Sequence, residues 1–302
     1  MAVVTVTYNS SAAIRKWWTT PTTGLTWIVV DNNSSDDSAH LARQLGAVVV
    51  ELQSNHGFGR ACNIGAATAG QVDWVAFVNP DVIWTTATLR AFLSHLPPGC
   101  AAACPLLVDE DGVPQRDLAR ESPRARQTLL LYLLGAAADR RADAVHRELL
   151  HSMDPLVDVA VTSGAFLAVR TRDFYSCGGF PDWLFLNYED IYLCDQLRKL
   201  GKVVVDRSAS FTHAKLASSS DVSTVARSAE TARACSAYLA QKESVASWLV
   251  AAVGILCGFT LRCTIRHPRA LRVLPSLVSV MMDEARSLRR GAPATAEARF
   301  IT

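Results

Sequence analysis

Short apolar runs alternate with helical patterns along the first part of the chain. The runs Ala2–Thr7, Leu25–Val30 and Ala47–Leu52 are rich in β-branched residues, and each ends at a polar or glycine-containing break. The segments 11–18 and 39–45 between them have helical spacing. This alternation predicts an α/β fold in which a mostly parallel sheet carries helices on its faces.

A fourth apolar run, Trp74–Val78, stops at Asn79-Pro80-Asp81. Proline cannot donate to a sheet ladder, so the strand should end there. Ligands of open α/β sheets collect at the carboxyl ends of the strands, and a carboxylate there suits a hard divalent cation that carries phosphate oxygens. We therefore expect Asp81 to bind a metal attached to a nucleotide diphosphate. A strand-ending turn with a solvated Asp81 is the alternative.

Two glycines, Gly57 and Gly59, follow the third strand and precede a helical pattern over 61–69. They match a dinucleotide-binding motif only in part, because Cys62 stands at the third glycine position. The alternative is a tight turn in which both glycines supply positive φ. Arg60 at the helix start is a candidate partner for phosphate.

The remaining strands and helices carry further candidate residues. We expect helices at 86–96 and 128–138, strands at 100–108, 157–169 and 202–205, and an exposed loop over the site at 114–127. Gly164 interrupts the 157–169 run, which indicates a bulge or a close approach by a ligand.

Glu189 and Asp190 follow an aromatic stretch and begin a helix that ends near Leu200. The helix dipole favours ionised carboxylates there, and a carboxylate beside an apolar wall suits a general base. Acidic residues are also common at helix starts for the dipole alone. His213 is a structural histidine or, through a neutral imidazole, a second metal ligand beside Asp81.

Composition narrows the function classes. The 302 residues have a net charge of +2 with mixed signs and no basic tract, which argues against nucleic acid. The eight cysteines lack zinc-site spacing, and Met1–Thr5 has no signal-peptide pattern. Free thiols in a reducing cytoplasm are therefore expected.

The chain changes character after about residue 220, and we expect a catalytic domain over 1–220, a helical segment over 221–290 and a disordered tail over 291–302. The run Val245–Leu261 is uncharged and only just long enough to span a membrane. It is followed by the basic residues Arg262, Arg266, His267, Arg269 and Arg272. We expect a helix on the inner membrane surface, its cations facing anionic lipid; a helix packed on the catalytic domain is the alternative.

Seven segments in order carry a family resemblance: VTVTYNS (4–10), IVVDNNSSDDS (28–38), NHGFGRACNIG (55–65), FVNPDV (77–82), TSGAFLAVR (162–170), GGFPDWLFLNYED (178–190) and His213. Together they resemble the inverting family-2 glycosyltransferases of the GT-A fold over about the first 215 residues. The closest likeness is to bacterial rhamnosyltransferases that act on polyprenyl-diphosphate-linked sugars. The resemblance implies one mixed, mostly parallel sheet flanked by helices, with a C-terminal helical extension.

The resemblance also implies roles for single residues. Thr7 and Tyr8 would border the nucleobase pocket, Asp31 and Asn32 would bind base and ribose, and Asn79 would lie near the ribose. Asp81, with His213, would hold Mg²⁺ or Mn²⁺, Gly164 would lie near the donor sugar, and Asp190 would be the base with Glu189 beside it. Tyr192 and Gln196 replace an Asp and an Arg of the family pattern.

The implied reaction is transfer of L-rhamnose from dTDP-L-rhamnose to a hydroxyl of a lipid-linked saccharide, at the cytoplasmic membrane face, in cell-wall or surface-polysaccharide synthesis. UDP- and GDP-sugar donors remain open. A nucleotidyltransferase would need a basic, glycine-rich loop that Tyr8-Asn9-Ser10 does not provide. A dinucleotide oxidoreductase and a catalytically impaired scaffold are the other rivals.

Overall fold

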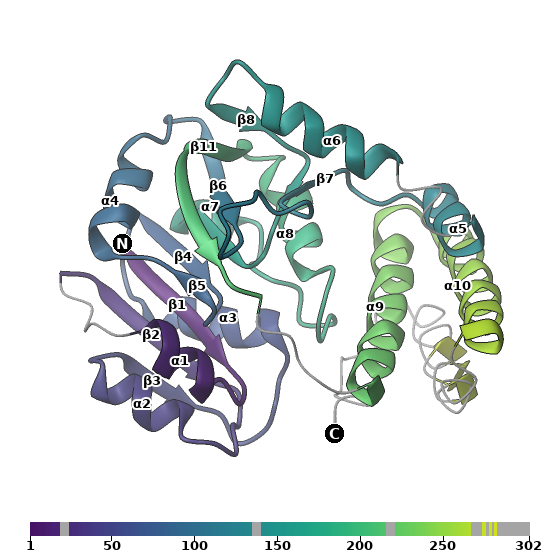
Figure 1. Cartoon of the computed structure of the whole chain (residues 1–302), viewed down its shortest axis with the longest axis horizontal. Coiled ribbons are helices and arrows are strands. Elements are labelled where there is room, and N and C mark those ends of the chain that lie inside the picture. The colour runs from purple at the N-terminus through teal and green to yellow at the C-terminus, as the bar shows by residue number, and fades with distance from the viewer. Residues whose placement is uncertain are drawn as a thin grey trace. The chain divides into compact units, whose positions relative to one another are not determined.

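The computed structural model describes residues 1–18, 24–134, 140–215, 221–266, 274–275, 278–279 and 281–282. The predictions for His267, Arg269, Arg272 and the tail 291–302 lie outside these residues, as do the side chains of Arg262 and Arg266. The chain divides into two compact units (Figure 1). The sheet unit comprises Met1–Glu121, Ala142–Pro181 and Glu189–Leu216, and the helical unit comprises Ser122–Arg141, Asp182–Tyr188 and Ala217–Thr302.

The described part of the sheet unit contains a nine-stranded mixed sheet with the order β3-β2-β1-β4-β10-β6-β11-β5, and β8 pairs with β11. The strands are β1 Ala2–Thr7, β2 Thr26–Asp31, β3 Val48–Glu51, β4 Trp74–Val78, β5 Val82–Ile83, β6 Cys100–Val108, β8 Leu156–Asp158, β10 Phe166–Arg170 and β11 Lys202–His213. Parallel pairing joins β1 to β2 and β4, β2 to β3, and β6 to β11, while β10 runs antiparallel between β4 and β6. The predicted α/β architecture is confirmed.

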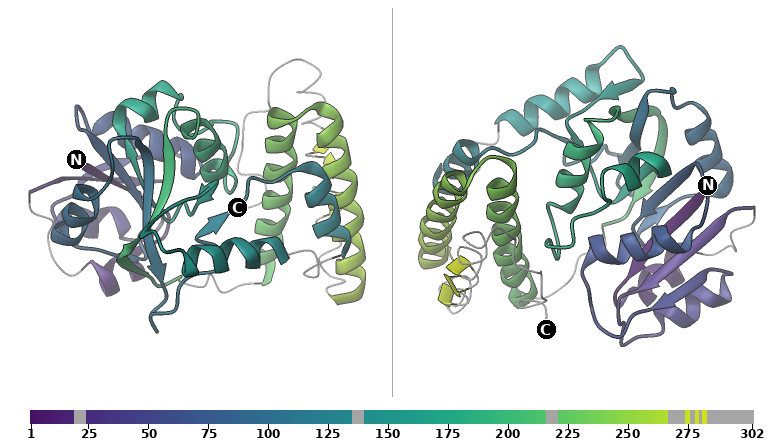
Figure 2. Two further views of the ribbon diagram at one scale, coloured as in Figure 1. Left: turned by 90° about the horizontal axis from the view of Figure 1, so that it is seen from above. Right: turned by 180° about the vertical axis from the view of Figure 1, so that it is seen from behind.

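Helices cover both faces of the sheet. The described helices of this unit are α1 Ser11–Trp17, α2 Ser38–Gln44, α3 Phe58–Thr68, α4 Thr86–Ser94, α6 Arg140–His151, α7 Thr171–Ser176 and α8 Glu189–Leu197. In Figure 1 α1 lies in front of the strands and α3 behind them, and the reversed view of Figure 2 brings α3 forward. Gly65 lets α3 approach β1, since a Cβ there would lie 2.3 Å from Val4 Cγ1.

Three sequence predictions are wrong in detail. The helix α3 begins at Phe58, so Gly59 is helical, and of the two glycines only Gly57 has positive φ, at 81°. The predicted strand 157–169 is three strands, β8, β9 (Val161–Thr162) and β10. The segment 114–127 is not an exposed loop, because Leu118 and Ala119 are buried and β7 (Ala119–Arg120) pairs with β9.

The helical unit is built from α5 Ala125–Leu134, α9 Asp221–Lys242 and α10 Val245–Arg266. Helices α5 and α10 pack closely, because a Cβ on Gly254 would lie 2.6 Å from Leu129 Cδ1. A buried ion pair joins Arg233 to Glu230 within α9 at 2.6 Å. One face of α10 is exposed and apolar, with Val245 at 54%, Leu249 at 56% and Val253 at 51%. Among the described helices, α10 included, none combines the length and apolarity that crossing a bilayer requires.

Candidate active site

Asp81 and His213 meet at the carboxyl end of β4. The turn after β4 is closed by a hydrogen bond from Val82 N to Asn79 O, and β5 then pairs with the end of β11 so that His213 lies opposite Val82. Ala214 N also donates to Asp81 O. As a result His213 Nε2 lies 3.3 Å from Asp81 Oδ1, and the histidine is only 7% exposed.

This pair suits a divalent cation. A carboxylate oxygen and a neutral imidazole nitrogen are donors that Mg²⁺ and Mn²⁺ accept, and Mg²⁺ usually takes few protein ligands and completes its shell with water and phosphate oxygens. Among the described residues no group of three or more His, Cys, Asp or Glu side chains is arranged to hold a metal. The two-donor arrangement therefore fits an ion that arrives with a diphosphate better than a permanent all-protein site.

Asp190, the predicted base, is held by three donors. Its Oδ2 accepts from Arg120 Nη2 at 2.9 Å and from Gly164 N at 3.1 Å, and its Oδ1 accepts from Ile191 N at 2.8 Å. Every contact donates to the carboxylate, which suits the ionised form that a general base needs. A Cβ on Gly164 would lie 3.0 Å from Asp190 Cβ, so glycine is required for this approach.

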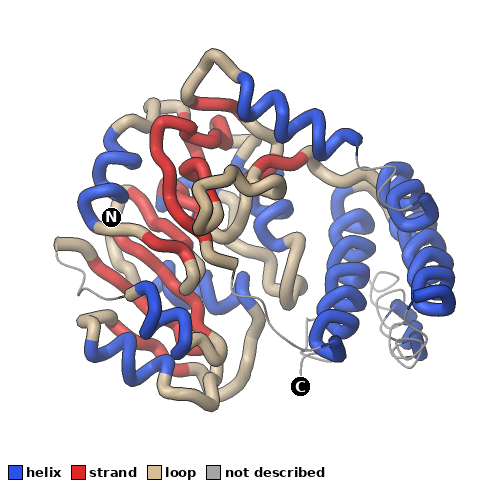
Figure 3. Tube along the Cα trace, in the orientation of Figure 1, coloured by secondary structure: helices blue, strands red, loops and turns tan. Residues whose placement is uncertain are grey.

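The segment 115–120 links the metal pair to the base. Gln115 Nε2 donates to His213 O at 2.8 Å, and Leu118 O accepts from Ser163 N and from Thr162 Oγ1. Two residues further on, Arg120 reaches Asp190. Figure 3 shows the loop that precedes β7 lying along the end of β11. The chain thus connects both sites through six consecutive residues.

A backbone bond also joins the two sites. Asn79 N donates to Ala165 O at 2.8 Å, directly after β4 ends and before β10 begins. Ala165 adjoins Gly164, whose amide contacts Asp190, and Asn79 is two residues from Asp81. The predicted metal ligand and the predicted base therefore belong to adjoining parts of one sheet edge.

The predicted nucleotide residues form a second group at the same edge. Thr7 Oγ1 donates to Asp31 Oδ1 at 2.8 Å, and Ser34 donates to both carboxylate oxygens through its amide and hydroxyl. Because β1, β2 and β4 are parallel neighbours, Thr7 and Asp31 end at the same edge as Asn79. Tyr8 follows Thr7 and is 43% exposed.

Asn32 is bonded within the protein rather than presented to solvent. Its Nδ2 donates to Asn55 Oδ1 and to Gly57 O, and its Oδ1 accepts from His56 N. All of these contacts lie in the loop before α3. Asn32 therefore fixes the loop 55–57, and its side chain has no N–H left for a ribose in this arrangement.

The side chains of Glu189, Tyr192 and Gln196 lie on other sides of α8 than the side chain of Asp190. Glu189 points toward α3, where a Cβ on Gly59 would lie 3.6 Å from Glu189 Cβ, and burial and the Glu189 charge raise the pKa of Cys62. Tyr192 and Gln196 lie roughly 200° and 240° around α8 from Asp190. Burial, with Cys177 nearby, raises the pKa of Tyr192. Both departures from the family pattern thus lie on the side of α8 away from Asp190.

Arg60 is half-buried in the first turn of α3, and the structure gives it no contact with the other predicted site residues. Sequence reasoning missed Gln115 and Arg120, because 114–127 was interpreted as an exposed loop. The available indication was the pair of apolar residues Leu118 and Ala119, which interrupt that polar segment and are buried.

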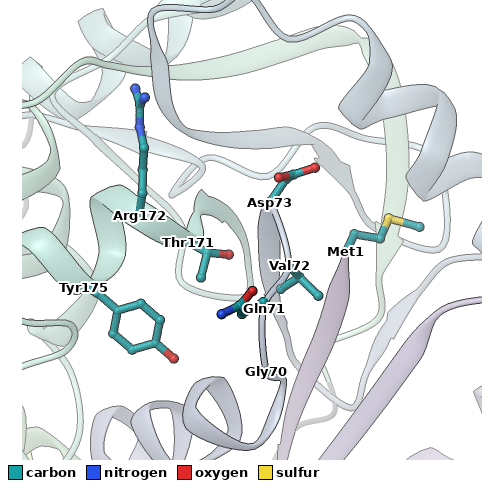
Figure 4. Close-up of a pocket in the computed structure, with 8 residues that line it drawn as sticks. All are labelled: Met1, Gly70, Gln71, Val72, Asp73, Thr171, Arg172 and Tyr175. Carbon is teal, nitrogen blue, oxygen red and sulfur yellow. The ribbon is translucent and has the colours of Figure 1, made fainter.

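A cavity of about 590 Å³ lies elsewhere on the sheet unit (Figure 4). Its lining includes Met1, Asp73, Thr171 and Arg172. These residues precede β1 and β4 and follow β10, so the cavity lies at the edge of the sheet opposite Asp81. No predicted site residue lines it.

The Glycosyl transferase family 2 model matches residues 2–143. The chain contains a family 2 glycosyltransferase domain. The matched stretch includes Asp31, Asp81, Gln115 and Arg120, whereas Asp190 and His213 lie beyond it.

The chain is also similar to curated rhamnosyltransferases. N-acetylglucosaminyl-diphospho-decaprenol L-rhamnosyltransferase of Mycobacterium tuberculosis is 28% identical over 221 residues, 67% of this chain and 71% of the relative. Rhamnosyltransferase WbbL of Escherichia coli is 27% identical over 154 residues, 48% of this chain and 56% of the relative.

Among solved structures, mannosyltransferase PcManGT from Pyrobaculum calidifontis, in complex with GDP-Man and Mn²⁺, is similar with a TM-score of 0.52 and 16% identity. The match covers 96% of this chain and 78% of that structure. At this identity the likeness concerns the fold, which is the GT-A fold predicted from the sequence.

Proposed function

We propose that this glycosyltransferase transfers L-rhamnose from dTDP-L-rhamnose to a hydroxyl of a polyprenyl-diphosphate-linked saccharide, with inversion and with a divalent metal. The observation that carries the proposal is the link from the Asp81–His213 pair to Asp190 through residues 115–120. The M. tuberculosis relative supports the sugar and the lipid-linked acceptor. A UDP- or GDP-sugar is the alternative donor.

The chain's own residues would perform a single displacement. Asp190, which accepts hydrogen bonds from Arg120 and from Gly164 N, takes the proton of the acceptor hydroxyl. That oxygen then attacks the anomeric carbon from the face opposite the nucleoside diphosphate, which leaves. One carboxylate is enough, because inversion needs no covalent intermediate.

Asp81 and His213 would hold Mg²⁺ or Mn²⁺, which would neutralise the charge that grows on the leaving diphosphate. Thr7 and Tyr8 would border the nucleobase pocket, Asp31 would lie at the base and ribose, and Asn79 would lie near the ribose. The alternative of a catalytically impaired scaffold rests on Tyr192 and Gln196, which replace two residues of the family pattern. Both lie on the side of α8 away from Asp190, so they give little reason to expect an impaired base.

The test is a transfer assay with purified enzyme, a GlcNAc-diphosphate-polyprenol acceptor and three donors: dTDP-L-rhamnose, UDP-GlcNAc and GDP-mannose. We expect metal-dependent transfer from dTDP-L-rhamnose and loss of transfer, by 10³-fold or about 4 kcal/mol, in Asp81→Ala and in Asp190→Asn. The exposed Asp182→Asn variant is the matched control and should keep wild-type turnover. Transfer from another donor alone, or unchanged transfer by Asp81→Ala, contradicts the proposal.

We also propose that the exposed face of α10 contacts the inner membrane surface, where a polyprenyl-linked acceptor would reside. Val245, Leu249 and Val253 are spaced four residues apart, so they form one apolar stripe along the helix. Leu249→Glu should weaken co-sedimentation with phosphatidylglycerol vesicles at least 5-fold, whereas Met153→Glu, at a fully exposed apolar residue outside α10, should not. Equal binding by Leu249→Glu would contradict the membrane contact.

A further inference from the structure

Gln115 forms two hydrogen bonds with one residue, His213. Its Nε2 donates to the backbone oxygen of His213 at 2.8 Å, and its Oε1 lies 2.8 Å from the ring Nδ1. Both residues are buried, with Gln115 6% exposed. The main chain of Gln115 is held as well, since its amide donates to Leu107 O at 2.9 Å.

These contacts determine which ring nitrogen carries the proton. The backbone oxygen of His213 only accepts, so the amide NH₂ of Gln115 must face it. The amide oxygen then faces Nδ1, and this oxygen also only accepts, so Nδ1 must donate. In the neutral imidazole the lone pair therefore lies on Nε2, the atom that is 3.3 Å from Asp81 Oδ1.

Rotating the Gln115 amide by a half-turn would place its oxygen against the His213 carbonyl oxygen. Two acceptors would then face each other in a buried site, and each would lose its hydrogen bond. The observed amide orientation is thus strongly preferred. The backbone of His213 is fixed in parallel by its pairing with Val82 in β5.

We infer that Gln115 is a positioning residue for the metal site: it fixes the tautomer and the ring orientation of His213 so that Nε2 is presented to the ion beside Asp81. The inference rests on the proposed metal-dependent function and assigns a role to a residue outside the predicted site. Residues that orient metal-binding histidines in this way typically contribute about 10–100-fold to metal affinity.

The test measures Mn²⁺ affinity by the electron paramagnetic resonance of free Mn²⁺, in the presence of saturating dTDP. We expect Gln115→Leu, which keeps the bulk and removes both hydrogen bonds, to weaken Mn²⁺ binding at least 10-fold. His213→Ala should weaken it at least as much. In the His213→Ala background Gln115→Leu should change the affinity less than 2-fold, because the imidazole ring that Gln115 orients is gone.

Asn63 offers a matched control in the same unit. Its side-chain amide also forms two hydrogen bonds with one residue, donating to Phe180 O at 2.9 Å and accepting from Phe180 N at 3.0 Å. Asn63→Leu therefore removes an equivalent pair of bonds away from Asp81 and His213, and should leave Mn²⁺ affinity within 2-fold of wild type. Circular dichroism of each variant confirms that the fold is retained.

The outcomes separate the inference from the proposed function. If wild type binds Mn²⁺ with dTDP and folded Gln115→Leu binds it equally well, the inference is overturned and metal dependence stands. The inference is also overturned if Asn63→Leu weakens Mn²⁺ binding as much as Gln115→Leu does. It is overturned as well if Gln115→Leu weakens Mn²⁺ binding in the His213→Ala background as much as it does in wild type. If wild type binds no Mn²⁺ with dTDP, UDP or GDP, the metal-dependent function itself fails.

Discussion

Gly164 shows how one missing side chain shapes the candidate base. Its amide donates to Asp190 Oδ2, and a Cβ at this position would lie 3.0 Å from Asp190 Cβ and 3.3 Å from Oδ2. The residue has no positive φ, so the need for glycine is steric rather than conformational. The sequence predicted a bulge or a close approach by a ligand at Gly164, whereas the group that approaches it in the structure is the Asp190 carboxylate of the protein itself.

Gly164→Ala should therefore displace Asp190 and lower kcat at least 10-fold, with a smaller change in donor KM. The reason is that the added methyl group occupies the space of the Asp190 side chain. Gly99→Ala is the control, because a Cβ there meets nothing within 4 Å, and its kcat should stay within 2-fold of wild type. Steady-state transfer kinetics give both values, and an unchanged kcat in Gly164→Ala would argue against Asp190 as the base.

At the scale of elements, the strand ends could be predicted because a change from apolar to polar residues marks them. Asp31 and Asp81 were placed correctly at such ends, and β4 and β6 have the predicted bounds. The contacts of 115–120 could not be predicted in the same way. Gln115 contacts His213, 98 positions away, and Arg120 contacts Asp190, 70 positions away. The local pattern of apolar and polar residues does not predict contacts between residues so far apart in the sequence.

The loop between β3 and α3 depends on one side chain. Asn32 makes three hydrogen bonds to residues 55–57, so Asn32→Ala should lower the free energy of unfolding by about 1–3 kcal/mol. Asn33→Gly is the control: Asn33 is exposed with φ of 66°, which glycine adopts readily, and its change should stay within about 0.5 kcal/mol. Urea unfolding measures both, and equal stability of Asn32→Ala and wild type would show that Asn32 does not fix the loop.

Across the whole molecule, seven described cysteines are free thiols, and most are buried. Burial raises the pKa of Cys104 and of Cys194 to about 12, and that of Cys100 to about 11, from 9.0. The folded state therefore binds these protons more tightly than the unfolded chain does. Their contribution to stability is fully present below pH 9 and is lost as the pH rises from 9 toward 11–12.

Urea unfolding at pH 7.5 and pH 10 tests this dependence. The free energy of unfolding should fall by about 4 kcal/mol between the two values, because each of these three thiols ionises in the unfolded chain above pH 9 and contributes about 1.4 kcal/mol at pH 10. Cys104→Ala should reduce the fall, whereas Cys257→Ala, at an exposed thiol, should not. If the free energy of unfolding of Cys104→Ala fell by as much between the two pH values as that of wild type, the buried Cys104 thiol would not be a cause of the pH dependence.

The most direct test of the central claim is calorimetric titration of dTDP with and without Mn²⁺, on wild type, Asp81→Asn and Asp190→Asn. If a metal at Asp81 and His213 holds the donor diphosphate while Asp190 acts on the acceptor, Mn²⁺ will tighten dTDP binding at least 10-fold in wild type and in Asp190→Asn. It will tighten binding less than 2-fold in Asp81→Asn. A full Mn²⁺ response in Asp81→Asn would contradict the account.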